Sequence, residues 1–266
     1  MKFLSALFLF LFSALPVLAQ VQSLDPDSAY RDLDTPYEFY EGNLLKNSEN
    51  EKGFDELPTA KFTALGSAKL YDESKLPKTT PWKDQKALQE RFVQMRDARF
   101  LEWARDPNFP RRETWMYPDD GCYSRAAVAN GNFFKWFVPV PGKVFAFGHL
   151  RVKTRNSPRG VVGWWYHVAP VVEVGNVKYV LDPSIEPKSP LPLKDWLARM
   201  GNPAKMKVAI CGSGTYSPRD NCAKETDGLE LRAKRVQQIF LGKEWARLQA
   251  MKRDPHKELG EEPPWL

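Results

Sequence analysis

Cysteine and histidine are scarce in this sequence of 266 residues, which contains three of each. The cysteines are Cys122, Cys211 and Cys222, and the histidines are His149, His167 and His256. No CxxC or HxxxH spacing occurs, which excludes a zinc module built from close-set ligand pairs. Internal repeats and low-complexity tracts are also lacking. With 42% hydrophobic and 27% charged residues, the composition excludes a disordered chain and collagen.

A large excess of one charge is lacking as well. Lys and Arg number 39 against 33 Asp and Glu, a net charge of +6. These charges are interleaved along the chain, so we expect no nucleic-acid partner.

Long hydrophobic runs are limited to the start of the chain. Residues 1–19 combine one Lys, a run of Phe, Leu and Ala, and small residues before Gln20, which is typical of a Sec-type signal peptide. A membrane anchor is the alternative, but the run is shorter than the roughly 20 residues that a span needs. Pro16 also interrupts it. We therefore expect a secreted or periplasmic protein with no membrane span after signal cleavage.

Export would place the three cysteines in an oxidising compartment, where an odd number leaves one unpaired. Cys211 and Cys222 enclose a loop rich in Gly, Ser, Pro and Asp, and a disulfide between them is the economical assignment. Cys122 would then be free. It is either a small buried hydrophobic residue or a reactive thiol.

The chain divides after the signal peptide. Residues 20–81 are polar and contain five prolines, which indicates an arm or a pro-segment. Residues 82–266 have the periodicity of a folded domain, and the candidate catalytic residues considered below lie in it.

Within this domain the patterns predict an α+β fold with helices, an antiparallel meander and further helices. The expected helices are 84–105, ended by Pro107 and Pro110; 121–131, with Asp119 or Asp120 as N-cap and Gly131 as stop; 192–200; and one or two over 229–251 around Gly242. The expected strands are 143–153, 161–174, 177–182 and 206–210, with a tight turn at Gly175-Asn176.

Cys122 lies at the predicted start of a helix, after Gly121. The macrodipole and the free backbone N–H groups stabilise an anion there, and the thiolate is the nucleophilic form of cysteine. Nucleophilic catalysis also needs a base within reach and a group that orients the base.

Strand pairing selects His167 and Asp182 for these roles. A turn at Gly175-Asn176 pairs residues whose numbers sum to about 351, so His167 faces residue 184 and Asp182 is its diagonal neighbour on the same sheet face. Taken singly, His167 could be a structural strand histidine and Asp182 a strand-end cap. Together with Cys122, they favour catalysis.

The other histidines lack this arrangement. His149 also lies in a strand, but no carboxylate follows it on the neighbouring strand, and His256 lies in a polar tail. Several aromatic residues could line a substrate groove or simply belong to the core: Trp115, Tyr117, Trp164, Trp165 and Tyr166.

The stretches YPDDGCYSRA (117–126), WWYHVAPVV (164–172) and YVLDPS (179–184) resemble the bacterial secreted protein-glutaminases. These are cysteine enzymes of the papain-like and transglutaminase-like group. The resemblance covers roughly residues 82–225, and PDDGCY is its most specific part. It implies a nucleophile at a helix N-terminus packed on an antiparallel sheet. It also implies a Cys–His–Asp triad of Cys122, His167 and Asp182, and a pro-segment that occupies the site until removal.

The implied reaction is deamidation of glutamine in proteins or peptides, giving glutamate and ammonia through a thioester. The Cys122 backbone N–H would hold the oxyanion, with Trp115 or Tyr117 as candidates for a second donor. No metal or organic cofactor is required, and we expect a monomer. Transamidation or peptide-bond cleavage by the same triad remains open, as does a non-catalytic envelope binding protein.

Overall fold

The computed structural model describes residues 68–216, 218, 222 and 229–266. The signal peptide predicted over 1–19, and the arm predicted over 20–81 as far as residue 67, lie outside these residues. The strands are β1 (Lys69–Leu70), β2 (Leu101–Trp103), β3 (Asp106–Arg111), β4 (Gly142–Lys153), β5 (Val161–Val174), β6 (Val177–Val180), β7 (Leu191–Pro192) and β8 (Lys207–Cys211). The helices are α4 (Gln85–Asp97), α5 (Cys122–Lys135), α6 (Leu193–Met200), α7 (Leu229–Ala250) and α8 (Pro255–Leu259), with short 3-10 turns η2 (Glu73–Lys75) and η3 (Pro203–Lys205).

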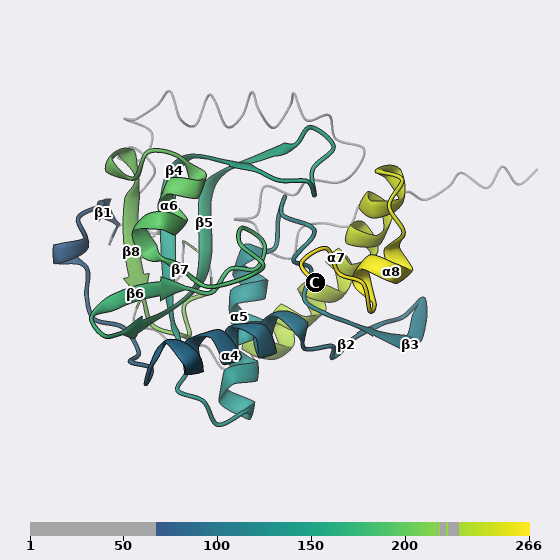
Figure 1. The fold of residues 1–266 in the computed structure, drawn as a ribbon, viewed down its shortest axis with the longest axis horizontal. Coiled ribbons are helices and arrows are strands. Elements are labelled where there is room, and N and C mark those ends of the chain that lie inside the picture. The colour runs from purple at the N-terminus through teal and green to yellow at the C-terminus, as the bar shows by residue number, and fades with distance from the viewer. Residues whose placement is uncertain (1–67, 217, 219–221, 223–228) are drawn as a thin grey trace, which may run out of the picture.

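A six-stranded antiparallel sheet in the order β1-β8-β4-β5-β6-β7 organises the fold (Figure 1). Its centre is the long β4–β5 pair. Alternate residues of β4 point to opposite faces, as a strand requires. Phe145 and Phe147 pack into a core with α5 and α7, whereas Val144 and Ala146 pack into a second core with α6. The predicted α+β class is therefore confirmed.

The β5–β6 hairpin has the predicted register. Val171 pairs with Val180 and Val174 with Val177, so the paired numbers sum to 351. Gly175 and Asn176 both have positive φ, 56° and 68°, as a two-residue hairpin turn with matching twist requires. Strand β6 ends at Val180, two residues earlier than predicted, because Leu181 faces Pro170, which accepts its hydrogen bond but has no N–H to return one.

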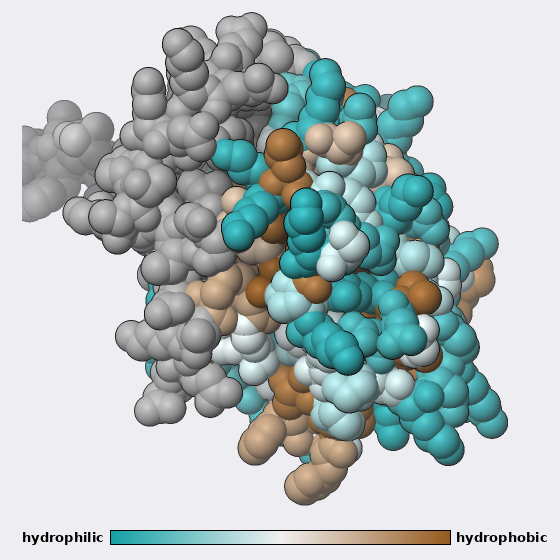
Figure 2. All heavy atoms as spheres, turned by 90° about the vertical axis from the view of Figure 1, so that its left-hand side faces the viewer, coloured by the Kyte–Doolittle hydropathy of each residue, from teal (hydrophilic) through white to brown (hydrophobic). Residues whose placement is uncertain are grey.

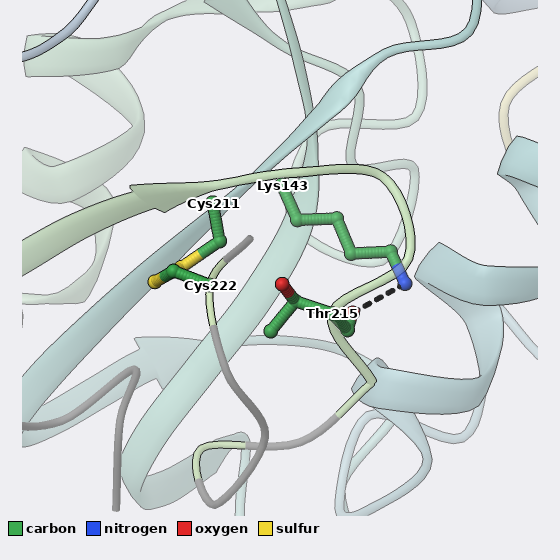
Figure 3. The surroundings of a disulfide bond; sticks show 4 residues. All are labelled: Lys143, Cys211, Thr215 and Cys222. Atoms are coloured by element: carbon green, nitrogen blue, oxygen red, sulfur yellow. Dashed lines mark hydrogen bonds between the residues drawn. A yellow bond between two sulfur atoms is a disulfide. The ribbon is translucent and has the colours of Figure 1, made fainter. Parts of the chain in front are cut away.

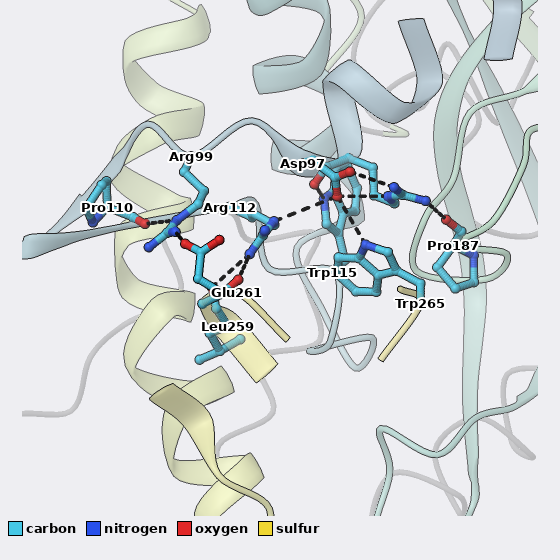
Figure 4. Close-up of polar contacts among 11 residues, drawn as sticks. Asp97, Arg99, Pro110, Arg112, Trp115, Pro187, Leu259, Glu261 and Trp265 are labelled. Atoms are coloured by element: carbon cyan, nitrogen blue, oxygen red, sulfur yellow. Dashed lines mark hydrogen bonds and ion pairs between the residues drawn. The ribbon is translucent and has the colours of Figure 1, made fainter. Parts of the chain in front are cut away.

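The first predicted helix is too long. Helix α4 ends at Asp97, and the region expected to continue it forms the β2–β3 hairpin instead. Pro107 and Pro110 lie in β3, a strand at the edge of a two-stranded sheet, where proline is tolerated. Asp97 itself binds Arg96, Arg112 and the indole N–H of Trp265, and so joins the end of α4 to the C-terminal segment (Figure 4).

Gly131 was predicted to stop a helix and does not, and of the one or two helices predicted around Gly242 the structure has one. Helix α5 continues through Gly131 to Lys135, and α7 is one helix through Gly242. A Cβ at Gly131 would lie 2.7 Å from the Glu230 side chain of α7, so this glycine allows the two helices to approach closely.

Residues 68–81, at the end of the predicted arm, lie against the domain. Strand β1 pairs with β8 at the sheet edge, and Pro81 bridges to Glu173 of β5. Figure 2 shows the side on which β1 and β8 lie, where hydrophobic and hydrophilic residues are interleaved over the described part. The domain boundary at residue 82 stays a prediction.

Candidate active site

Cys122 is the first residue of α5 and is 7% exposed. The N-cap is Gly121, not Asp119 or Asp120 as predicted, and no side chain caps the helix. Gly121 adopts the left-handed conformation with φ of 83°, and its N–H donates to Oδ1 of Asp120 at 2.7 Å. The backbone N–H groups of the first turn of α5 therefore have no side-chain cap. They lie at the N-terminal end of the helix, where the helix dipole stabilises an anion.

The segment that leads to Cys122 is held by Arg125 from the next turn of α5. Nη1 of this buried guanidinium donates to the carbonyl oxygens of Asp120, Tyr117 and Thr114, at 2.8, 3.1 and 3.3 Å. One cation therefore fixes the path of seven residues before the cysteine.

Helix α7 holds the same segment from the other side. Gln237 accepts hydrogen bonds from the N–H and hydroxyl of Thr114 and donates to Ser124 Oγ at 2.7 Å. Glu244 accepts from the N–H of Met116 and pairs with Arg111 at 2.6 Å. Both Gln237 and Glu244 are buried.

Sequence analysis missed these positioning residues, but a signal for them exists. Gln237, Glu244 and Arg247 recur at spacings of seven and three, so they share one face of the predicted helix with apolar residues. Polar residues on an apolar helix face are rarely buried without a partner.

His167 lies in β5 and is 1% exposed, and Asp182 lies just after β6 and is 5% exposed. The N–H of Leu181 donates to the carbonyl of Pro170, which extends the ladder by one step beyond β6. Nε2 of His167 is 2.7 Å from Oδ2 of Asp182. Strand pairing therefore brings the predicted histidine and carboxylate together.

Asp182 accepts four hydrogen bonds. Oδ1 accepts from the N–H and the hydroxyl of Ser184 at 3.1 and 2.5 Å, and Oδ2 accepts from His167 and from the indole N–H of Trp196 at 3.0 Å. Burial alone would raise the pKa of Asp182, but the charge of His167 and these hydrogen bonds outweigh burial and lower the pKa to about 2. The carboxylate is thus held ionised.

The pKa of His167 shifts in the opposite direction. Burial alone would lower it, but the charge and hydrogen bond of Asp182, followed by interaction with Cys122, raise the pKa to about 9. Nδ1 has no hydrogen-bond partner of standard geometry among the described residues. Because Nε2 is bound to the carboxylate, Nδ1 is the nitrogen left to exchange a proton with the Cys122 thiol.

Two tryptophans enclose the histidine ring. Trp164 stacks on it with centroids 4.5 Å apart and ring planes at 12°, and Trp196 lies at 5.7 Å and 28°. The indole N–H of Trp164 also donates to the carbonyl of Pro118, four residues before Cys122, at 2.9 Å. Of the aromatic residues considered for a groove, Trp164 stacks on the histidine. Four of the five are buried, Trp115, Tyr117, Trp164 and Tyr166, and Trp165 is half-buried.

The backbone N–H groups of Trp115 and Tyr117, and the Trp115 indole, are not available as second oxyanion donors. The backbone N–H of Trp115 donates to Glu113 at 2.7 Å and that of Tyr117 to Thr114 at 3.1 Å, while the Trp115 indole donates to Arg96. These donors are therefore already satisfied. The other histidines lie at the surface: His149 is exposed at the irregularity of β4, and His256 is exposed against Phe109 and Trp245.

The predicted cysteine pairing is confirmed. Cys211 and Cys222 form a disulfide, and Cys122 is a free, buried cysteine (Figure 3). Next to the bridge, Nζ of the buried Lys143 donates to the carbonyl of Thr215 at 2.6 Å. The bridge and this hydrogen bond hold the segment after β8 against β4.

Neither a metal cluster nor a membrane span is found in the part of the chain that the structure describes. No three His, Cys, Asp or Glu side chains there are grouped to hold a metal ion. No helix there is long and apolar enough to cross a bilayer.

Comparison with known proteins gives one family and several similar structures. Residues 88–200 match the family model described as glutaminase. The chain is 22% identical to the protein-glutaminase of a crystal structure, covering 60% of this chain and 89% of that one, with a TM-score of 0.48. It is also 22% identical to the protein-glutaminase of Chryseobacterium proteolyticum solved by NMR (61% and 88% covered, TM-score 0.48) and to a pro-protein-glutaminase in a crystal structure (78% and 81% covered, TM-score 0.48).

No curated protein matches the chain significantly. The family match covers all three residues singled out from the sequence, and the resemblance drawn from PDDGCY and the two strand motifs is confirmed over this region. Over residues 88–200 the chain is therefore similar to the glutaminase family.

Proposed function

We propose that the protein is an amidohydrolase that deamidates glutamine side chains in proteins or peptides, with Cys122, His167 and Asp182 as its catalytic triad. The observation that carries this proposal is the His167–Asp182 pair at 2.7 Å, whose histidine interacts with a cysteine at a helix N-terminus. The glutaminase match over the same residues supports an amide substrate.

The first half-reaction forms a thioester. The Cys122 thiolate attacks the carboxamide carbon of glutamine, and the carbonyl oxygen becomes an oxyanion stabilised by the Cys122 backbone N–H at the start of α5. His167, which carries a proton on Nδ1 in its charged form, gives this proton to the leaving nitrogen. The carbon–nitrogen bond breaks, ammonia leaves and the acyl group stays on sulfur.

The second half-reaction uses water. Nδ1 of His167, now neutral, accepts a proton from water while the oxygen attacks the thioester carbon. The carbon–sulfur bond then breaks and releases glutamate and the thiolate. Asp182 stays ionised and holds the imidazole through Nε2 in both halves, as its low pKa requires.

Ammonia release from a casein-like protein tests this proposal, together with the mass of the intact product. Deamidation adds about one dalton per glutamine, a transglutaminase would crosslink the substrate or attach an amine, and a peptidase would cleave the backbone. Cys122→Ala is expected to abolish ammonia release, since it removes the nucleophile. Equal rates for Cys122→Ala and the unmodified enzyme would overturn the triad assignment.

We also propose that the protein is secreted or periplasmic, with residues 1–19 as its signal peptide. The disulfide supports this, because such bonds persist in oxidising compartments. N-terminal sequencing of the exported protein is expected to begin at Gln20, and an intact N-terminus on exported protein would contradict the cleavage site.

A further inference from the structure

Glu113 is a buried acidic residue that the proposed mechanism does not use. It lies between β3 and residues 114–121, the nucleophile segment that leads to Cys122, and it is 2% exposed. Neither of its carboxyl oxygens has a hydrogen-bond partner among the described residues. An unpartnered carboxylate is far more costly to bury than a neutral carboxylic acid, so this environment favours the protonated form.

The arginines around Glu113 are bound to other groups. Arg111 of β3 pairs with Glu244 of α7 at 2.6 Å. Arg112 donates to two backbone carbonyls that follow α8, at 2.9 and 2.7 Å (Figure 4). Arg125 of α5 donates to three backbone carbonyls of the chain before Cys122. None of these three guanidinium groups donates to Glu113.

A cavity of about 10 Å³ borders Glu113. The other charged side chains of its wall come from three places: Arg111 and Arg112 at the end of β3, Glu244 of α7 and Glu258 of α8. This volume is at the lower limit of the roughly 10–15 Å³ that one water molecule needs. One water can bind a neutral acid, but it is too little to hydrate a carboxylate.

The protonation of Glu113 therefore contributes to the stability of the fold. Burial raises the pKa of Glu113 well above its usual value of 4.5, and the charge of Arg125 offsets this only in part. Because the pKa is raised by folding, the contribution is complete below pH 4.5 and is lost as pH rises through the raised pKa.

Glu113 is joined to the residues that hold the nucleophile. The next residue, Thr114, donates its N–H and its hydroxyl to Oε1 of Gln237 at 3.1 and 2.9 Å. Gln237 in turn donates to Oγ of Ser124 in the first turn of α5 at 2.7 Å. A movement of Glu113 toward water would thus disturb the contacts that position Cys122.

We propose that Glu113 is a proton-binding site that makes the nucleophile segment sensitive to pH. The carboxyl group is neutral in the folded protein, and its proton passes to solvent when the group ionises as pH rises. The carboxylate then moves toward water or draws water into the cavity, the contact of Thr114 with Gln237 weakens, and Cys122 is displaced reversibly. The effect on activity rests on the proposed deamidation, whereas the proton-binding site does not.

Urea unfolding of the full chain between about pH 5 and 9 tests the proton-binding site, with Glu113→Gln as a neutral variant of nearly the same size. The unfolding equilibrium constant of the wild type should rise about tenfold more per pH unit than that of Glu113→Gln, until Glu113 ionises in the folded state. Glu113→Met also removes the ionisable group and should show the same difference from the wild type. Glu90→Gln, at an exposed position of α4, is the control and should follow the wild type.

Alkylation of Cys122 by iodoacetamide measures the response of the nucleophile segment, because this cysteine is 7% exposed in the folded protein. The thiolate fraction changes with pH in both proteins, so the ratio of the wild-type rate to the Glu113→Gln rate isolates the effect of Glu113. This ratio should be near one at about pH 5 and should rise at least about fivefold at alkaline pH, where the wild type is still folded.

Parallel pH dependences of unfolding for the wild type and both Glu113 variants would overturn the proton-binding site. An alkylation ratio that stays near one while the unfolding curves separate would overturn the coupling to the nucleophile segment. Ammonia release by the same preparations distinguishes the two proposals. If the wild type releases no ammonia although its unfolding differs from that of Glu113→Gln as expected, the proposed function fails and the proton-binding site stands.

Discussion

The indole N–H of Trp196 and the imidazole of His167 bind the same oxygen of Asp182, at 3.0 and 2.7 Å. Trp196 belongs to α6 and is fully buried, and its ring also lies against that of His167. One side chain thus fixes the carboxylate and covers the imidazole. We interpret Trp196 as a positioning residue that acts through Asp182.

Replacing Trp196 by Phe is expected to lower kcat/KM for deamidation about tenfold. The substitution keeps an aromatic ring but removes a hydrogen bond to a charged group, which contributes about 1.5–3 kcal/mol. Because that hydrogen bond also lowers the pKa of Asp182, the acid limb of the pH–rate profile should move to higher pH. Steady-state kinetics across pH measures both effects.

Trp265→Phe is the matched control, since Trp265 also donates its indole N–H to an aspartate, Asp97, at 3.1 Å (Figure 4). It is expected to reduce stability slightly and leave the pH–rate profile unchanged. If Trp196→Phe lowers stability but does not move the acid limb, Trp196 has only a structural role.

The stability of the fold should depend on pH through the His167–Asp182 pair. The pKa of His167 is raised from 6.5 to about 9, so its contribution is complete below pH 6.5 and is lost as pH rises through 9. The pKa of Asp182 is lowered from 3.8 to about 2, so its contribution is complete above pH 3.8 and is lost as pH falls through 2. The pair is expected to stabilise most between about pH 4 and 6.5.

Urea unfolding at a series of pH values measures this dependence, and His167→Gln is the comparison. The free energy of unfolding of the wild type should fall between pH 6.5 and 9 more steeply than that of the variant, because other titrating groups are common to both. Parallel curves would show that the pKa of His167 is not raised by folding.

Local periodicity and turn chemistry were sufficient to predict the part of the site that depends on neighbouring strands. Gly175-Asn176 fixes the hairpin register, and the register places Asp182 beside His167. The start of α5 at Cys122 was predictable from the apolar periodicity that follows Gly121, although the identity of the cap was not. A left-handed glycine at this position replaces the expected carboxylate cap.

Features that depend on distant segments were not predictable in this way. The stop of α4 at Asp97 is accompanied by contacts to Arg112 and Trp265 from far along the chain. Likewise, helix α5 passes through Gly131, where α7 packs closely against it. The residues around Gly131 in the sequence do not indicate that contact. The hydrogen bond of Trp196 to Asp182 joins α6 to the segment after β6, and it too could not be predicted from local sequence patterns.

Replacing the buried Arg125 by Met is expected to destabilise the protein by about 2–5 kcal/mol, because it leaves the carbonyls of Thr114, Tyr117 and Asp120 without this donor. Arg125→Lys should recover part of the loss. Lys135→Met, on the exposed side of α5, should cost less than about 1 kcal/mol, since its partner Glu230 is near the surface. Chemical denaturation compares the three variants, and similar losses for Arg125→Met and Lys135→Met would contradict the role of Arg125.

Gly121→Ala is expected to impair both stability and deamidation, for two separable reasons. The left-handed φ of 83° costs a non-glycine residue about 1–2 kcal/mol, and an added Cβ would lie 2.9 Å from the ring of Phe240. Gly160→Ala isolates the first cost, because Gly160 has φ of 70° with no atom within 4 Å of the added Cβ. For Gly160→Ala we expect the free energy of unfolding to fall by about 1–2 kcal/mol and kcat/KM to stay near normal. For Gly121→Ala we expect a larger fall in the free energy of unfolding. Its kcat/KM should be reduced at least tenfold, because the contact with the Phe240 ring displaces the start of α5 and with it Cys122. Adding Phe240→Ala to Gly121→Ala should restore activity in part despite the cavity it creates, because it removes the clash. If Gly121→Ala behaves like Gly160→Ala in both measurements, the close packing of Phe240 does not position the cysteine.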